Sequence, residues 1–524
     1  MLDGSPIGAI SDTTSEGRLD FEAAITSPGQ LALGSSATGR WRGASDRDWF
    51  RVSLEADQSY QFSLGSSKGL APNLLLRNST GDVVAEGVRR SARKSSLTLT
   101  TDDPGLFYLD AGASRRGRST YRLQATAVEN DPLTVATASG PGFRPPRSNV
   151  DSITGLIDQD IRDWVNYSLT DSLVNKTELR EILSAAGTDD GVVDATELKD
   201  LRTLSSALSI YLDPAKASYL QDIYTNVVTS HPANAWWTAG TSSRTALGDL
   251  SAGSTNLTLE RLLAKWFDGS DLPLNRIGDM SFGYRRASGA LFVNDVTLSD
   301  VSQGAAGTCY LLAAAQVIAK STPQLIQQMF CDNGDGTYGV RFYGQDGGNF
   351  WVTVDSRVPV PASGSPGGEL WVSLLEKAYA QANETGLLGR DLAINSYEDV
   401  QGGSFDALMH LSGAAVTAFS AYYAVPGSQW TDNLPGWQNV ETAAREALNR
   451  GTSLWLGSYG STTGSNGKAN LVYAHAFSIS SYNSSTGLYV VNNASGAAGG
   501  NTWNGSFAAS WADLFSVQGV VAWV

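Results

Sequence analysis

The sequence predicts a multidomain α+β protein with an N-terminal antiparallel β-sandwich, a helical middle segment and a C-terminal core of helices and strands. Three observations support this fold class. The 524 residues suffice for about three or four domains of ordinary size. Short runs of alternating apolar and polar residues fill the first quarter of the chain, and helical periodicity follows. Both patterns then recur together in the last part.

The composition excludes several classes of function. The chain has 37 Lys and Arg against 52 Asp and Glu, a net charge of -15, so we expect neither nucleic acid nor an anionic membrane as a partner. An acidic chain suits calcium and an exported protein. No run of eighteen apolar residues predicts a membrane span, and residues 1–20 lack the pattern of a signal peptide. We expect a secreted or cell-surface monomer. Cys309 and Cys331 are the two cysteines, so no disulfide framework is expected.

Residues 15–130 predict the sandwich. Alternating runs are separated by turn-forming stretches such as Ser79-Thr80-Gly81-Asp82, and several strands at this spacing are typical of an antiparallel sandwich. The predicted strands are 49–54, 60–64, 73–77, 96–100, 106–109 and 121–124.

The stretches 45–50, 56–60 and 104–109 resemble the bacterial pre-peptidase C-terminal domain. That resemblance implies a module that accompanies secreted bacterial proteases. Asp46 and Asp48 are candidate calcium ligands at a strand edge, but acidic turn residues are more often simply solvated, and we favour that interpretation.

Pro-rich residues 131–150 predict a linker, and residues 151–285 a helical segment. Helical periodicity covers 153–168, 176–186, 195–208, 215–229 and 257–267.

This helical segment contains an internal repeat, in which the pattern of residues 171–179 recurs at 190–198. Gly191, Asp194 and Glu197 have the spacing of the second half of an EF-hand loop, but Ala186 stands where the first carboxylate is required. We therefore favour a degenerate helix–loop–helix pair that packs against a neighbour, rather than a working calcium site.

The stretch from Gln303 to Tyr310 precedes an Ala- and Leu-rich helix at 311–320, which places Cys309 on the first helical turn. Backbone N–H groups at a helix start lower the pKa of a thiol, and the thiolate is the nucleophile. The Gln303 amide, across a compact turn, and the Cys309 N–H are candidate donors for one oxyanion. The alternative is a buried cysteine that acts as a small apolar residue.

Further along, 338–342 and 349–354 predict paired strands joined by a Gly-containing turn, and 369–379 predicts an amphipathic helix. About 235 C-terminal residues then resemble the protease core of the calpain family. The motifs that carry the resemblance are Gln303-Gly304 with Gly307 and Cys309, then 355–359, 374–380, Gly402-Gly403, 472–479 and 490–496. The resemblance implies a papain-like fold, with a helical subdomain at 286–405 and a β subdomain at 406–524.

A cysteine nucleophile needs a base and a group that orients the base. His475 lies in an alternating run, and we expect it in the middle of a strand, with Asn493 brought beside it by the next strand. His410 lies on the apolar face of a predicted helix, where a satisfied core role is expected instead. Gly403 and Ala474 are expected to line the substrate cleft.

The resemblance also implies calcium binding in the core. Asp300 and Glu369 match the carboxylates of the first family site, and the backbone carbonyls of Val293 and Asp295 would complete the oxygen ligands. The second site does not match, since Gly499, Gly500, Asn504 and Ser506 replace its carboxylates.

Two aromatic positions of the family also differ. Ser495 stands where the family has Trp after Asn-Pro, and Tyr310 replaces the Trp that follows the cysteine. We therefore expect calcium gating to be less strict than in the family.

The sequence as a whole predicts a calpain-like cysteine endopeptidase acting on protein and peptide substrates. The helical segment is a candidate inhibitory prosegment, cut near Arg285-Arg286. Two alternatives remain: an acyltransferase or transglutaminase that uses the same triad, and a non-catalytic binding protein on a protease scaffold.

Overall fold

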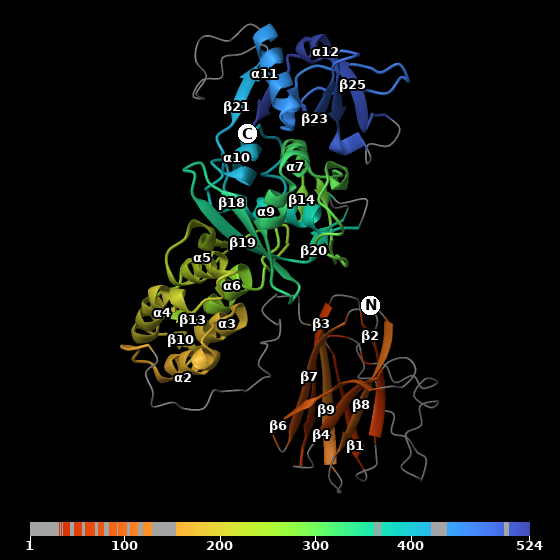
Figure 1. The fold of residues 1–524 in the computed structure, drawn as a ribbon. Helices are drawn as coiled ribbons and strands as arrows, with labels where there is room; N and C mark the ends of the chain where they lie inside the picture. The colour runs from red at the N-terminus through yellow and green to blue at the C-terminus, as the bar shows by residue number, and fades with distance from the viewer. Residues whose placement is uncertain are drawn as a thin grey trace. The chain divides into compact units, whose positions relative to one another are not determined.

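The computed structural model describes parts of residues 31–127, and residues 153–420 and 437–524 apart from short gaps at 361–362, 364–367 and 497–501. It divides into two compact units, Met1–Thr134 and Val135–Val524, which are described separately (Figure 1). The predicted linker 131–150, Asp46, Gly499 and Gly500 lie outside the described residues. The limits predicted for the individual domains stay predictions.

The first unit contains two antiparallel sheets. One has the strand order β1-β9-β3-β7-β6 and the other β2-β8-β4-β5. Their facing side chains share one core, in which Phe62 and Leu123 of the first sheet meet Phe50 and Leu76 of the second. The strands are β1 Ser35–Trp41, β2 Arg47–Leu54, β3 Gln58–Ser66, β4 Pro72–Arg77, β5 Val83–Glu86, β6 Val88–Ser91, β7 Lys94–Thr101, β8 Gly105–Ala113 and β9 Ser119–Ala127.

The antiparallel arrangement predicted for this unit is confirmed. Each of the six predicted strands falls inside an observed one, whereas β1, β5 and β6 were not predicted. Asp48 is not a solvated turn residue, because it is 1% exposed and accepts the hydroxyl proton of Tyr121 at 2.5 Å.

The second unit begins with the helical segment. Its helices follow the predicted ranges closely, except that the first starts at residue 159, because Asp158 caps it through the Ile161 N–H. The helices are α2 Gln159–Ser168, α3 Lys176–Ala185, α4 Ala195–Ala207, α5 Ala217–Val228 and α6 Asn256–Trp266.

The EF-hand-like loop is held together by protein groups. Glu197 caps α4 by accepting the N–H of Asp194 at 2.7 Å, and its other oxygen accepts the N–H of Gly187 at 2.8 Å. The loop then forms β10 (Val192–Val193), which pairs with β13 (Ser254–Thr255) just before α6. This favours the degenerate pair, since the carboxylate that would close a calcium loop already has backbone partners.

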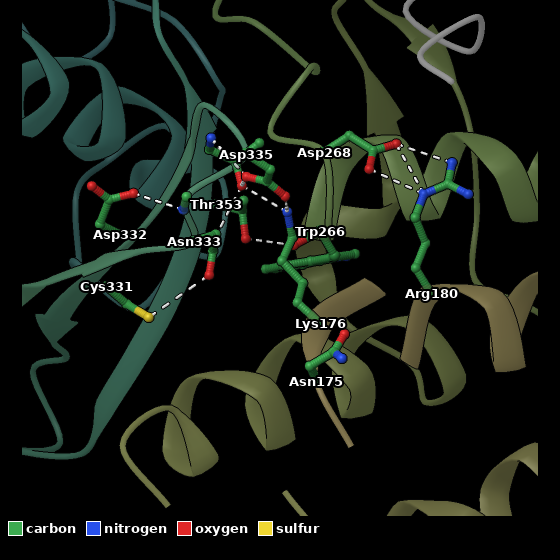
Figure 2. A network of polar contacts seen from close by, with 12 residues as sticks. Asn175, Lys176, Arg180, Trp266, Asp268, Cys331, Asp332, Asn333, Asp335 and Thr353 are labelled. Carbon is green, nitrogen blue, oxygen red and sulfur yellow. Dashed lines mark hydrogen bonds and ion pairs between the residues drawn. The ribbon is translucent and has the colours of Figure 1, made fainter. Parts of the chain in front are cut away.

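The helical segment packs on a three-stranded sheet formed by β17 Phe330–Asp332, β18 Thr337–Tyr343 and β19 Asn349–Asp355. Figure 2 shows part of this junction, where Lys176 of α3 reaches Asp335 at 2.7 Å and the Thr353 hydroxyl of β19 donates to the Trp266 carbonyl at 2.5 Å. Cys331 lies here too, with its Sγ at 3.8 Å from Asn333 Oδ1. Cys331 is therefore part of a structural junction.

Deeper in the junction, the Lys265 ammonium lies 2.7 Å from Asp271 and 2.6 Å from Glu384, and all three side chains are at most 2% exposed. Such a buried ion triple is costly to disrupt, because removing one partner leaves an uncompensated charge. The helical segment is thus joined to the core through its interior.

The remaining chain forms a helical part and a second sheet. The helical part contains α7 Cys309–Ser321, α8 Pro323–Met329, α9 Trp371–Asn383 and α10 Asp406–Ser412. The second sheet has the order β21-β26-β22-β23-β24-β25, with α11 Trp437–Asn449 and α12 Trp511–Ser516 beside it. Its strands are β21 Thr417–Ser420, β22 Leu454–Ser458, β23 His475–Asn483, β24 Leu488–Asn492, β25 Ser506–Ser510 and β26 Val520–Trp523.

Helix α7 packs directly on strands β22 and β23 of this sheet. Buried Leu and Ala side chains of α7 share one core with Trp455 and Ala476, and the Trp455 indole donates to the Tyr310 carbonyl at 2.9 Å. This packing brings the start of α7 to the start of β23.

Among the described residues, no helix is long and apolar enough to cross a lipid bilayer.

Candidate active site

Cys309 is the first residue of α7, as predicted, and its side chain is partly buried. The backbone N–H groups of Ala476, Tyr310 and Cys309 itself are directed at its sulfur. Ala476 directly follows His475, so the start of α7, which carries the thiol, lies next to the start of β23, which carries the imidazole.

His475 is the first residue of β23, not a mid-strand residue as predicted. The hydrophobic alternation continues upstream to Val472, but the chain turns at Ala474, so pairing with β22 begins only at His475. Its Nε2 lies 2.9 Å from Asn493 Oδ1. The same oxygen accepts the backbone N–H of Ser495 at 2.9 Å, so Nε2 is the protonated nitrogen and Nδ1 is available as a base.

Asn493 follows the last residue of β24, one position beyond the expected strand. Its backbone N–H donates to Gly505 at 2.8 Å, which fixes it at the sheet edge. The rings of Phe477 and Trp503 pack against the imidazole, with centroids at 4.9 Å and 5.2 Å. Trp503 was missed from the sequence, because a lone Trp in a Gly-rich stretch carries no spacing signal.

Gln303 is 9% exposed and is held from the β side of the site. Its backbone N–H donates to Ala494 at 3.1 Å, and its side-chain carbonyl accepts the hydroxyl proton of Ser495. The amide nitrogen donates to Ala306 at 2.8 Å, which leaves its second N–H for another acceptor. The structure thus brings Gln303 next to the segment that follows Asn493.

The loop between Gln303 and Cys309 is anchored by a buried carboxyl that sequence reasoning missed. Glu376 of α9 accepts the hydroxyl of Thr308 and, at 2.7 Å, that of Ser363. Ser363 in turn accepts the Gly304 N–H at 2.8 Å. One carboxyl therefore holds both ends of the loop, although the motif that contains Glu376 had been noted only as part of a resemblance.

The pKa values of Cys309 and His475 do not favour the thiolate that was expected from the sequence. Burial raises the pKa of the Cys309 thiol, and this outweighs the three backbone N–H groups that lower it. Burial also lowers the pKa of His475, against the hydrogen bond to Asn493 that raises it. Burial likewise raises the pKa of Glu376. Both shifts favour a neutral thiol and a neutral imidazole in the free site near pH 7.

Gly403 and Ala474 lie on opposite sides of the site. A Cβ at Gly403 would lie 2.5 Å from the ring of Tyr310, so glycine is needed there for packing against the residue after the nucleophile. Ala474 is exposed and has φ = 53°, a left-handed conformation that costs a non-glycine residue about 1 kcal/mol or more.

The predicted calcium ligands are only partly brought together. Asp300 is close enough to Glu369 to raise its pKa, although burial is the larger cause. Asp300 accepts the Thr297 N–H at 2.7 Å, Val293 gives its N–H to Glu369, and Asp295 is exposed. Glu369 is 6% exposed, and besides the Val293 N–H its carboxylate has a hydrogen bond to the Trp371 side chain, which lowers its pKa.

The neighbouring carboxylates of Glu369 and Asp300 fit a cation with oxygen ligands. No cluster of three or more His, Cys, Asp or Glu side chains suited to a metal is found among the described residues, so a calcium ion here would depend on backbone carbonyls as well.

Residues 284–516 match the family described as calpain family cysteine protease. This region is similar to the domain of calpain family cysteine proteases. It contains every candidate catalytic residue described above. The match confirms the resemblance of the C-terminal region to the calpain family.

Among similar curated proteins, a calpain-type cysteine protease of Oryza sativa subsp. japonica is 38% identical over 136 residues, which cover 24% of this chain and 6% of the rice protein. The calpain-2 catalytic subunit of Homo sapiens is 28% identical over 204 residues, 36% of this chain and 25% of the human protein. The chain thus spans a quarter or less of the length of these calpains.

Among solved structures, the pre-peptidase C-terminal domain of a collagenase from Bacillus anthracis has 17% sequence identity and a TM-score of 0.18, and the match covers 19% of this chain and 93% of that domain. The assignment of the N-terminal sheets to that module stays a prediction.

Proposed function

We propose that the chain is a calpain-like cysteine endopeptidase that hydrolyses internal peptide bonds of proteins with Cys309, His475 and Asn493. The observation that carries the proposal is the 2.9 Å contact between His475 Nε2 and Asn493 Oδ1, next to the N–H of Ala476 at the Cys309 sulfur. The domain family supports the reaction class.

In the proposed reaction, His475 Nδ1 takes the thiol proton as the Cys309 sulfur attacks the peptide carbonyl carbon. The carbonyl oxygen becomes an oxyanion, for which the Cys309 N–H and the second N–H of Gln303 are the donors. The protonated imidazole then gives its proton to the leaving amine nitrogen as the C–N bond breaks. Water hydrolyses the thioester with His475 again as base, which releases the carboxylic acid and restores the thiol.

The neutral resting pair defines the role of each group. Because both groups are neutral before substrate binds, proton transfer accompanies attack, and Asn493 stabilises the imidazolium that forms. The neighbouring rings of Phe477 and Trp503 exclude water from one side of His475. Ala474 and Gly403 would border the substrate backbone.

Calcium is part of the proposal. Asp300, Glu369 and the carbonyls of Val293 and Asp295 would hold the ion, which when bound would supply positive charge between two carboxylates. We further propose that calcium gating is weaker than in the family, since Ser495 stands where the family has Trp and donates to Gln303. Export from the cell is also part of the proposal.

Release of the helical segment as a prosegment gains no support from its packing. The buried triple of Lys265, Asp271 and Glu384 would be broken by its removal. A chain lacking residues 1–286 is therefore expected to lose its fold or activity, whereas a prosegment would leave an equally or more active core.

Cleavage of denatured casein by the purified chain, with calcium and with chelator, tests the function against Cys309→Ser. Loss of cleavage in C309S, with Cys331→Ser as the matched control that retains it, is the expected result. An equal rate in C309S would overturn the proposal. The acyltransferase alternative predicts amine incorporation without casein fragments, and the binding-protein alternative predicts no fragments at all.

A further inference from the structure

A hollow of about 560 Å³ opens beside the turn at Gly402-Gly403, on the helical part of the protease domain. Gly402 donates its N–H to the Gly307 carbonyl at 2.9 Å, and Tyr310, the neighbour of the nucleophile, forms part of the wall. The hollow therefore lies beside the residues that flank Cys309 in the sequence.

The wall of this hollow is rich in carboxylates. Four come from Asp391, Glu398, Asp399 and Asp406, against the single guanidinium of Arg390. Asp391 and Asp406 are exposed, so they face solvent at its mouth. The hollow thus favours a positively charged occupant.

The charge of Arg390 is already committed to the wall itself. Its guanidinium donates to the carbonyls of Asp399 at 3.0 Å and Gly402 at 2.9 Å, and to the Tyr310 hydroxyl at 3.1 Å. It also lies over the Tyr310 ring, 5.5 Å from the centroid. Arg390 therefore shapes the hollow and does not offer free donors to a negatively charged ligand.

A second, independent observation comes from His410, which lines the hollow and is 3% exposed. Its Nδ1 lies 2.8 Å from the Tyr379 hydroxyl, which hydrogen-bonds onward to Tyr310, whose hydroxyl donates to the Val400 carbonyl at 2.9 Å. This direction of donation makes Nδ1 the protonated nitrogen and Nε2 a bare acceptor. Nε2 has no hydrogen-bond partner among the described residues.

We propose that the hollow is a subsite for a lysine or arginine side chain of the peptide substrate, which places its cationic head between the carboxylates and donates an N–H to His410 Nε2. The inference rests on the proposed peptidase function. An organic cation fits better than a metal ion, because the described residues contain no cluster of three side chains suited to a metal.

Binding and cleavage are measured separately, so that the two proposals can fail independently. Fluorescein-labelled short peptides of one Leu-Ala-Ser frame carry a single Lys that is moved one position at a time, with norleucine at the same position as the uncharged control. Their affinity for the full chain with Cys309→Ala is measured by fluorescence anisotropy. Cleavage of the same peptides by the unmodified chain is followed by mass spectrometry.

Lys at one position is expected to bind about tenfold more tightly than norleucine. Asp391→Asn with Asp406→Asn should reduce this preference to about twofold or less. Glu446→Gln, which removes one exposed carboxylate on α11, should leave it unchanged. The subsite proposal is overturned if Lys and norleucine peptides bind with equal affinity at every position. It is also overturned if Lys raises the affinity by the same factor at every position.

His410→Gln tests the acceptor itself, since an amide oxygen can accept the same N–H while His410→Leu cannot. Retained preference in H410Q and loss in H410L, with both variants keeping the far-ultraviolet circular dichroism of the parent, supports the assignment. An unchanged preference in a folded H410L overturns the role of His410. Absence of cleavage in every peptide, with the binding preference present, counts against the peptidase function alone.

Discussion

The hydroxyl of Ser495 donates to the side-chain carbonyl of Gln303, and so joins the segment after Asn493 to the loop before Cys309. The Ser495 N–H meanwhile bonds to Asn493 Oδ1 at 2.9 Å. One residue therefore touches both the group that orients the base and the group proposed to stabilise the oxyanion. This link explains how the site can be ordered where the family Trp is missing.

Ser495→Ala is expected to lower kcat about three- to tenfold with little change in KM, because Gln303 loses the bond that orients its amide while substrate contacts remain. Ser495→Thr keeps the hydroxyl and serves as the control. Steady-state kinetics on a casein-derived peptide provide the measurement. A fall in S495T as large as that in S495A would show that Ser495 acts through packing.

The neutral Cys309 and His475 pair predicts a broad pH profile for kcat/KM. Activity requires a neutral imidazole, and since the pKa of His475 is lowered, the acid limb should lie below its ordinary value of 6.5. The alkaline limb should lie above the ordinary thiol range, because the raised pKa of Cys309 delays loss of the proton that the leaving amine needs. A thiol titration by alkylation rate that shows a midpoint below 7 would contradict this arrangement.

Asp222→Asn is expected to stabilise the second unit at pH 7. Burial raises the pKa of Asp222 to about 6, and the Trp351 N–H, 2.8 Å away, only partly offsets this. Between pH 4 and 6 the unfolded chain has released this proton and the folded chain still holds it, so rising pH favours unfolding by up to about 3 kcal/mol.

Thermal unfolding of D222N and of the parent across this pH window measures the effect. The parent should lose stability from pH 4 to 6 relative to the variant, and the two curves should then run parallel. Asp346→Asn, in an exposed turn on the same sheet, is the matched control. Parallel curves throughout the window would show that Asp222 titrates normally in the fold.

Much of the fold was predictable, because local signals coincide with tertiary structure. The capping residues Asn175 and Asp194 each begin a helix at the predicted position, with a capping box to Glu178 and Glu197. β5 was missed because its exposed Val83 and Val84 lack alternation with buried positions. An edge strand of this kind forms because it pairs with another strand of the sheet, and its own sequence carries no local pattern that predicts it.

The candidate catalytic residues could be predicted from the sequence, but their supports could not. Cys309, His475, Asn493 and Gln303 lie in motifs with spacing, whereas Glu376 and Trp503 act across 68 and 28 residues of sequence through contacts that only folding creates. The pKa of Cys309 was expected to fall from the helix start alone, and burial by β23, which no local pattern reports, reverses the direction.

Removal of calcium provides a test of the proposed metal site that does not depend on cleavage. Glu369 carries a raised pKa and lies near the charge of Asp300, and a bound cation would relieve both. Calcium should therefore raise the melting temperature of the chain, and Glu369→Gln should abolish most of this gain. Glu398→Gln, which changes an exposed carboxylate that lines the hollow beside Gly402, should retain it. No shift with millimolar calcium in the parent would exclude the site.

Glu376 offers the sharpest test of how the loop before Cys309 is held. With a raised pKa and two hydroxyl donors, its carboxyl is replaced almost isosterically by an amide, so Glu376→Gln should keep activity within about threefold. Glu376→Ala leaves Thr308 and Ser363 without their shared acceptor, and kcat should fall at least about tenfold while alkylation of Cys309 becomes faster as the loop opens. Equal kcat in E376A and the parent would mean that Gly304 and Thr308 are positioned by the backbone of α7 alone.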